Sequence, residues 1–188
     1  THLYFNGCGG NIAAGKYNNG TPEARQQLTD RIYTAIVASE QDLRRQRIER
    51  AAWQTRDVLL SPRGAFTEAS LMTEVQKQDN ALANRIRPAM MLSFLRRCER
   101  KQPIVLSALH VNQTTLLHLP SECFVEYQLR AQQLRPACFV ATAGLGDCGT
   151  WYIPVKEEYD KGGYEPSVAF SDPGIDDLLT RGMEQVLA

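Results

Sequence analysis

The sequence lacks two features that would assign it at once to a broad class of proteins. No run approaches the roughly 18 apolar residues that a membrane helix needs, so a transmembrane segment is not expected. The 21 basic and 21 acidic residues cancel, whereas a general binder of nucleic acid or anionic membranes usually carries a basic excess. The composition therefore predicts neither a bilayer-spanning protein nor a nucleic-acid partner.

Paired cysteine motifs are also missing. The chain has five cysteines, and none belongs to a C-x-x-C pair. The odd number argues against a complete set of disulfides, and the wide spacing argues against a structural zinc cluster built on cysteine. The cysteines therefore do not indicate a redox compartment.

What the chain does have is the composition of a globular domain. Its 188 residues are 43% apolar and 22% charged, enough to bury a sizeable core. The sequence opens at Thr1 without an initiator Met and enters an apolar stretch directly, so residues 1–6 are predicted to form a short buried strand. Such a start suggests a fragment of a longer protein.

Helical and strand-like patterns alternate irregularly, which predicts an α/β fold of the mixed α+β kind in a single domain or part of one. Thr21 and Pro22 mark a helix start, and Leu28, Ile32 and Ile36 follow at helical spacing, so one face should pack inward. The other expected elements are a strand at 53–60, a short helix from 67 through 75, a helix at 81–100, a hairpin of 103–111 with 114–119, a helix at 124–134, a strand at 138–142, a loop at 144–149 and a helix from 172.

The segment from Gly10 to Lys16 matches most of the phosphate-binding pattern G-x-x-x-x-G-K. Tyr17 stands where that pattern places the magnesium-binding hydroxyl, and no helix is expected to begin directly after it. Three interpretations therefore stay open: a nucleotide-binding loop, a plain glycine-rich turn, or an active-site loop of another kind.

Three stretches in the second half carry further candidates. They are Leu119-Pro120-Ser121-Glu122, Tyr152-Ile153-Pro154 and Tyr164-Glu165. Taken singly, a glutamate at a helix start is often a cap or dipole partner, and a tyrosine is more often packing than chemistry.

Taken together, and with Glu157-Glu158-Tyr159 between them, these stretches resemble the end of the catalytic domain of the neutral/alkaline ceramidase family. That family has a Pro-Gly-Glu turn, a Tyr-x-Thr-Thr loop, a Glu-Glu-Tyr segment and a Gln-Tyr-Glu-Gly turn in the same order. Upstream, Gly10-Asn11-Ile12 resembles the family's glycine loop, which continues into Ser-Pro-Asn. The chain is most similar to bacterial ceramidase-like proteins of unassigned substrate.

The resemblance implies a zinc-dependent hydrolase of lipid metabolism that cleaves a linear amide, as in a ceramide-like sphingolipid, or an ester. It implies that Glu122 and Tyr152 bind zinc together with two histidines outside this chain. It also implies that Tyr164 lies beside the carbonyl group that reacts. Gly10, Asn11 and Ala13 would form the substrate or oxyanion loop. Residues 1–188 would be the C-terminal portion of the catalytic domain, with a small-molecule or lipid substrate; family members are often secreted.

Two positions depart from the family pattern. Ala13 falls where the family has its serine, and Ser121 replaces the glycine before the metal-binding glutamate. The first departure supports an alternative function, a catalytically inactive ceramidase-like domain that binds a ligand or partner.

Overall fold

The computed structural model describes residues 3–41, 43–78, 81–146 and 150–188. The chain divides into two units: the first joins the residues up to Asn11 with Arg50–Ala188, and the second is Ile12–Glu49. Both contain helix, and the first also contains strands, so the predicted α/β class is confirmed.

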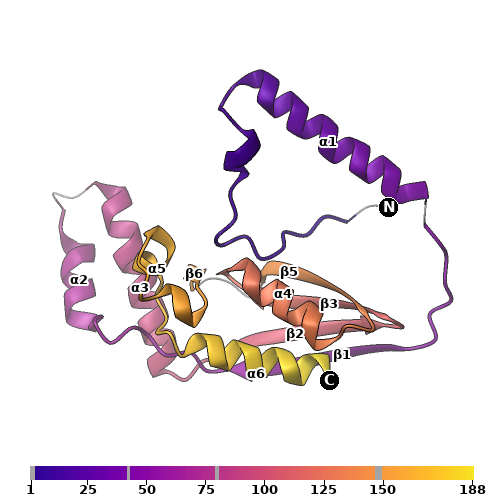
Figure 1. The fold of residues 1–188 in the computed structure, drawn as a ribbon. Coiled ribbons are helices and arrows are strands. Elements are labelled where there is room, and N and C mark those ends of the chain that lie inside the picture. Colours follow the sequence, from indigo (N-terminus) through magenta and orange to yellow (C-terminus); the bar gives the residue numbers. More distant parts are fainter. Residues whose placement is uncertain (1–2, 42, 79–80, 147–149) are drawn as a thin grey trace. The chain divides into compact units, whose positions relative to one another are not determined.

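A four-stranded sheet forms the centre of the first unit (Figure 1). Its strands lie in the order β1 (Ala51–Val58), β2 (Ile104–Val111), β3 (Thr114–Pro120) and β5 (Phe139–Gly146). The first three are antiparallel neighbours, and β5 runs parallel to β3. The predicted hairpin is confirmed: β2 turns into β3 at Asn112, whose φ of 50° is a left-handed conformation that asparagine tolerates.

Two helices, α4 (Val125–Leu134) and α6 (Ile175–Leu187), pack against this sheet and against each other (Figure 1). Gly182 allows α6 to come close, because a Cβ at that position would lie 2.5 Å from Leu106 Cδ1 and 3.3 Å from Val58 Cγ2. Sheet and helices together bury the core, which includes Ile104, Leu106, Ala108, Leu117, Tyr127, Ala131, Leu179, Met183 and Val186.

The remaining elements of the first unit surround the ends of the strands. Helices α2 (Glu68–Gln76) and α3 (Leu82–Glu99) pack on each other. The short strands β4 (Glu122–Cys123) and β6 (Tyr152–Ile153) form a separate parallel pair, followed by the 3-10 turn η2 (Lys156–Glu158) and the short helix α5 (Tyr164–Val168). Strand β5 extends into the predicted loop as far as Gly146, and residues 147–149 of that loop lie outside the described residues.

The predicted strand at residues 1–6 is wrong where the structure describes it. Residues 3–6 form no strand, and the side chains of Leu3 and Tyr4 are 79% and 87% exposed. A strand needs a ladder of hydrogen bonds to a neighbour, whereas among the described residues this segment has one such backbone bond, from the Gly144 N–H to the Asn6 carbonyl at 2.7 Å. Thr1 and His2 lie outside the described residues.

The second unit consists of the 3-10 turn η1 (Ala14–Tyr17) and the helix α1 (Pro22–Gln41). The predicted helix start is confirmed, because Thr21 Oγ1 accepts the Ala24 N–H at 3.2 Å. Within this unit Ile32 and Ile36 are 63% and 45% exposed, so the unit does not itself cover the predicted inward face, which stays a prediction. The described part of this unit offers α1 little more than η1 to pack against. None of the described helices is long and apolar enough to cross a bilayer.

Candidate functional site

Strands β4 and β6 bring the two predicted metal ligands together. In this parallel pair Glu122 lies directly opposite Tyr152. The Glu122 N–H donates to the Trp151 carbonyl at 3.2 Å, which fixes the register of the pair. Both side chains are half-buried. We call residues 121–123 and 150–153 the β4–β6 corner.

In this corner the Glu122 carboxylate lies beside the Tyr152 phenol, and no cationic side chain of the described residues pairs with it. Burial raises the pKa of the Tyr152 phenol, and the Glu122 carboxylate raises it further through its charge and a hydrogen bond. Within the described ranges, no lysine or arginine forms an ion pair with Glu122. A cation between the two side chains would favour the ionised form of both.

Carboxylate and phenol oxygens side by side therefore fit as two ligands of a zinc ion, which accepts oxygen donors alongside histidine and cysteine. A structural or catalytic zinc takes at least three protein ligands. Over residues 3–41, 43–78, 81–146 and 150–188 no group of three histidine, cysteine or acidic side chains is placed to hold a metal. A complete site would need ligands beyond these residues.

Tyr164 joins the same corner. Two glycines in the left-handed region, Gly162 with φ 78° and Gly163 with φ 101°, turn the chain so that Tyr164 begins α5. Its ring lies 5.9 Å from that of Tyr152, centre to centre, at an edge-on angle of 75°. Tyr164 is 54% exposed.

The predicted glycine loop packs against β4 through its backbone. The Gly10 N–H donates to the Cys123 carbonyl at 2.9 Å. A Cβ at position 10 would lie 2.3 Å from the Glu122 carbonyl oxygen, so only glycine allows this approach. The loop is thereby held beside the strand that carries Glu122.

Asn11 has a structural task that the sequence pattern did not indicate. Its Oδ1 accepts the Val125 N–H at 2.9 Å, and its Nδ2 donates to the Glu126 carboxylate at 2.9 Å. The side chain thus satisfies an orphan donor in the first turn of α4. Ala13, the third residue predicted for this loop, belongs to the second unit.

Three non-glycine residues adopt left-handed backbone where these segments meet. They are Ser121, Leu145 and Trp151, with φ of 55°, 62° and 61°. Two of them directly precede Glu122 and Tyr152, and the Leu145 N–H donates to the Ser121 carbonyl at 3.0 Å. Such a conformation costs roughly 1–2 kcal/mol for a residue with a Cβ. Costs of this kind concentrate at functional sites.

Sequence reasoning missed the side chains behind Trp151. Its ring stacks on Phe170 with centres 5.9 Å apart and planes at 26°, and the Arg87 guanidinium lies 5.9 Å from the ring centre. The indole N–H is buried and has no acceptor among the described residues. No sequence spacing links these residues, because α3 and the segment after α5 deliver them from distant parts of the chain.

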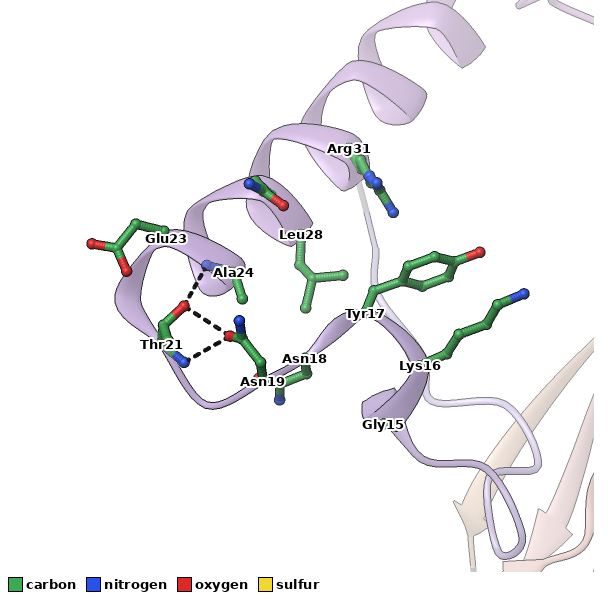
Figure 2. Close-up of a pocket in the computed structure, with 11 residues that line it drawn as sticks. Gly15, Lys16, Tyr17, Asn18, Asn19, Thr21, Glu23, Ala24, Leu28 and Arg31 are labelled. Carbon is green, nitrogen blue, oxygen red and sulfur yellow. Dashed lines mark hydrogen bonds between the residues drawn. The ribbon is translucent and has the colours of Figure 1, made fainter.

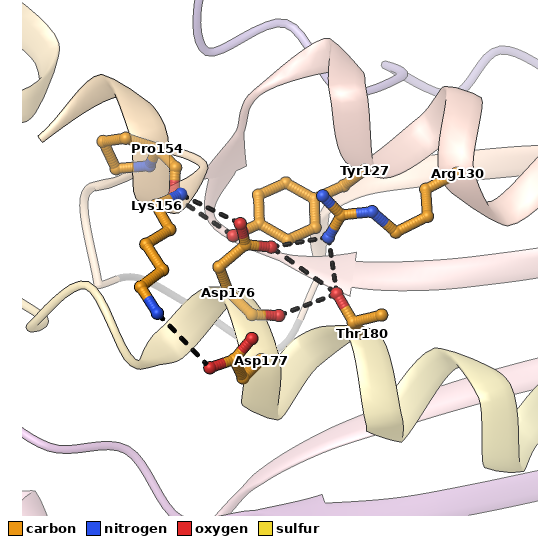
Figure 3. Close-up of polar contacts among 7 residues, drawn as sticks. All are labelled: Tyr127, Arg130, Pro154, Lys156, Asp176, Asp177 and Thr180. Carbon is orange, nitrogen blue, oxygen red and sulfur yellow. Dashed lines mark hydrogen bonds and ion pairs between the residues drawn. The ribbon is translucent and has the colours of Figure 1, made fainter.

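A second polar cluster lies between α4, α6 and the segment after β6 (Figure 3). The Asp176 carboxylate contacts Arg130 Nη1 at 2.5 Å and accepts the Lys156 N–H at 2.9 Å. Burial disfavours the charge on Arg130, but the hydrogen bond and charge of Asp176 outweigh it and raise the pKa of the guanidinium. The Tyr127 hydroxyl donates to the Pro154 carbonyl at 3.1 Å. These bonds fix the chain immediately after Tyr152.

The second unit has a cavity of about 360 Å³ between residues 15–19 and the start of α1 (Figure 2). Lys16 Nζ and Arg31 Cζ lie 5.2 Å and 4.8 Å from the centre of the Tyr17 ring. The segment from Gly10 to Lys16 neither follows a strand nor opens a helix, since α1 begins only at Pro22. Within the described residues it therefore lacks the strand–loop–helix context in which this pattern indicates nucleotide binding, and that interpretation gains no support.

No protein-family model matches the chain, and a comparison with curated proteins found no match. Among solved structures, neutral ceramidase from Pseudomonas aeruginosa aligns with 94% of this chain at a TM-score of 0.59 and 13% identity. The chain has a ceramidase-like fold. A ceramidase complexed with C2 aligns with 45% of the chain and 14% of its own length, at a TM-score of 0.41 and 18% identity.

The resemblance predicted from the sequence is thus confirmed at the level of the ceramidase-like fold. The alignment covers 34% of the neutral ceramidase chain. The chain therefore spans about a third of the length of the solved structure that it matches over most of its residues.

Proposed function

We propose that the chain contributes to the active site of a zinc-dependent hydrolase that cleaves an amide or ester bond of an acylated small molecule or lipid. The observation that carries this proposal is the pairing of Glu122 with Tyr152, without a cation, inside a ceramidase-like fold. Glu122 and Tyr152 are the proposed zinc ligands. The remaining ligands come from outside the described residues, in a longer protein of which residues 1–188 form the C-terminal portion of the catalytic domain.

The chemistry of the site divides between the metal and the side chains of this chain. Zinc lowers the pKa of a coordinated water toward 7 and polarises a carbonyl. Tyr164, exposed beside Tyr152, donates its hydroxyl proton in a hydrogen bond to the carbonyl oxygen of the substrate as negative charge develops there. Gly10 and Asn11 themselves pack against β4 and α4, and they form one wall beside Glu122.

The substrate proposed first is an N-acyl amide of the ceramide type, because the fold is ceramidase-like. Ala13, at the position of the family's serine, favours a second candidate: an inactive ceramidase-like domain that binds a ligand or partner. The two candidates differ in whether bond cleavage occurs.

A hydrolysis assay on the longest chain that the reading frame encodes tests the proposal. Fluorogenic N-acyl amides and acyl esters would be incubated with the zinc-loaded protein, its Tyr164→Phe variant and, as a matched control, Tyr33→Phe. We expect turnover that falls about 100-fold in Tyr164→Phe, the usual scale for loss of one oxyanion donor, and is unchanged in Tyr33→Phe. A zinc-loaded protein that cleaves neither class of substrate would support the inactive binding domain.

A further inference from the structure

Ser121 joins the two halves of the β4–β6 corner through its side chain. It is 4% exposed, and its Oγ accepts the Thr150 N–H at 2.5 Å. The Ser121 and Thr150 hydroxyls also lie within hydrogen-bond distance, at 3.2 Å. Thr150 is 1% exposed, so water does not compete for either bond. These contacts tie together positions 29 residues apart in the sequence.

The backbone of Ser121 adds a third connection. Its carbonyl accepts the Leu145 N–H at 3.0 Å, at the end of β5. One buried residue is thus bonded to the end of the central sheet and to the residue that leads into Trp151 and Tyr152. The turn that carries Glu122 and the turn that carries Tyr152 are held at a fixed separation by the same side chain.

The backbone conformation of Ser121 is one that favours glycine. Its φ of 55° is one that glycine adopts freely and that costs a residue with a Cβ roughly 1–2 kcal/mol. A serine here accepts that cost and gains two hydrogen bonds that glycine cannot make. Ser121 therefore supplies a contact rather than mere backbone freedom.

We infer that Ser121 is a positioning residue, which sets Glu122 against Tyr152 through its bonds to Thr150. This inference rests on the proposed function, because it assigns to Ser121 the alignment of the two proposed zinc ligands. Groups that orient metal ligands typically contribute 10–100-fold in metal affinity.

The test is the zinc dissociation constant, measured by competition with a chromophoric chelator, for the longest chain that the reading frame encodes. We expect Ser121→Ala to bind zinc at least 10-fold more weakly than wild type. Ser121→Gly relieves the left-handed backbone strain but also removes the side-chain hydrogen bonds to Thr150, so we expect it to weaken zinc binding to a similar extent. Thr150→Ser keeps the hydroxyl and the N–H, and its affinity should match wild type.

The control is Ser107→Ala, the same chemical change at a buried serine of β2 whose hydroxyl faces His118 at 3.4 Å. Thermal melting accompanies each measurement, and Ser121→Gly replaces Ser121→Ala if the latter does not fold. Wild-type zinc affinity in both Ser121 variants, or equal weakening in Ser107→Ala, would overturn the positioning role alone. A wild-type protein that binds no zinc would overturn the proposed function together with it.

Discussion

Two carboxylates of the first unit lie in opposite surroundings. Asp176 is 5% exposed and is held by Arg130 and by the Lys156 N–H, so its charge is compensated on every side that the structure describes (Figure 3). Glu122 is half-buried and faces the Tyr152 phenol, and the described lysines and arginines form no ion pair with it. The same functional group is thus a structural element in one place and an unpaired charge in the other.

The difference indicates where chemistry is to be sought. A buried ion pair whose hydrogen bonds are complete is needed for the fold, because removing one partner leaves the other charge uncompensated. The carboxylate of Glu122 lies beside a phenol, on strands entered through left-handed residues, and within the described residues it has no ion pair whose loss would strand a charge. The conformational cost of the left-handed residues before these strands has a functional explanation if a cation binds there.

Asp176→Ala should give the largest loss of stability. It leaves the partly buried Arg130 without its partner and the Lys156 N–H without an acceptor, and we expect the free energy of unfolding to fall by roughly 3 kcal/mol. The matched control is Asp177→Ala, whose side chain is 61% exposed and 3.9 Å from Lys156 Nζ. Urea unfolding measures the free energy of unfolding of both variants. Equal losses in the two would show that Asp176 is no more important for the fold than the exposed Asp177.

Gly10→Ala should come next. The new Cβ would meet the Glu122 carbonyl at 2.3 Å, so the loop must move away from β4, and we expect a loss of about 2 kcal/mol. Gly9→Ala serves as control, because a Cβ there meets nothing within 4 Å. If Gly10→Ala is as stable as Gly9→Ala in urea, the loop is not held against β4 as described.

Tyr127→Phe should cost about 1 kcal/mol at neutral pH through the lost hydrogen bond to Pro154. Burial raises the pKa of Tyr127 far above its usual value. The native state therefore keeps this proton while the unfolded chain loses it above pH about 10, so stability falls as the pH rises beyond that point. The decline should be shallower in Tyr127→Phe than in wild type or in the exposed control Tyr33→Phe. Identical slopes in denaturant titrations at pH 8–12 would contradict the burial of this phenol.

Glu122→Gln should have the smallest effect on the metal-free protein. The substitution removes no ion pair, and the amide can still face the Tyr152 hydroxyl, so we expect a change within about 0.5 kcal/mol. Urea unfolding of metal-free protein at pH 7 is the measurement. A loss as large as that in Asp176→Ala would show that Glu122 is a structural carboxylate after all.

The sequence predicted the helices and the hairpin better than it predicted what packs against each of them. Local signals such as the hydroxyl at Thr21, the turn at Asn112 and the spacing of α4 located helices and the hairpin correctly. The same periodicity predicted a packed face for α1, and the second unit by itself leaves Ile32 and Ile36 exposed, because periodicity shows that a face is apolar and not what covers it. The apolar stretch at Leu3 failed as a strand for a related reason: a partner strand cannot be read from local pattern.

The candidate site was partly within reach of sequence reasoning. The resemblance singled out Glu122, Tyr152 and Tyr164, and the structure brings these three together. It gave no indication that Asn11 caps α4, and it treated Ser121 only as a departure from glycine. Both roles depend on contacts across the fold, over 114 and 29 residues of sequence, which no local spacing encodes.

The most direct test of the account is the zinc content per chain, determined by elemental analysis on the longest chain that the reading frame encodes. We expect about one zinc ion per chain, lost in Glu122→Ala and retained in Asp177→Ala. A wild-type protein that stays free of zinc, after metal-free handling and re-addition of zinc, would contradict it.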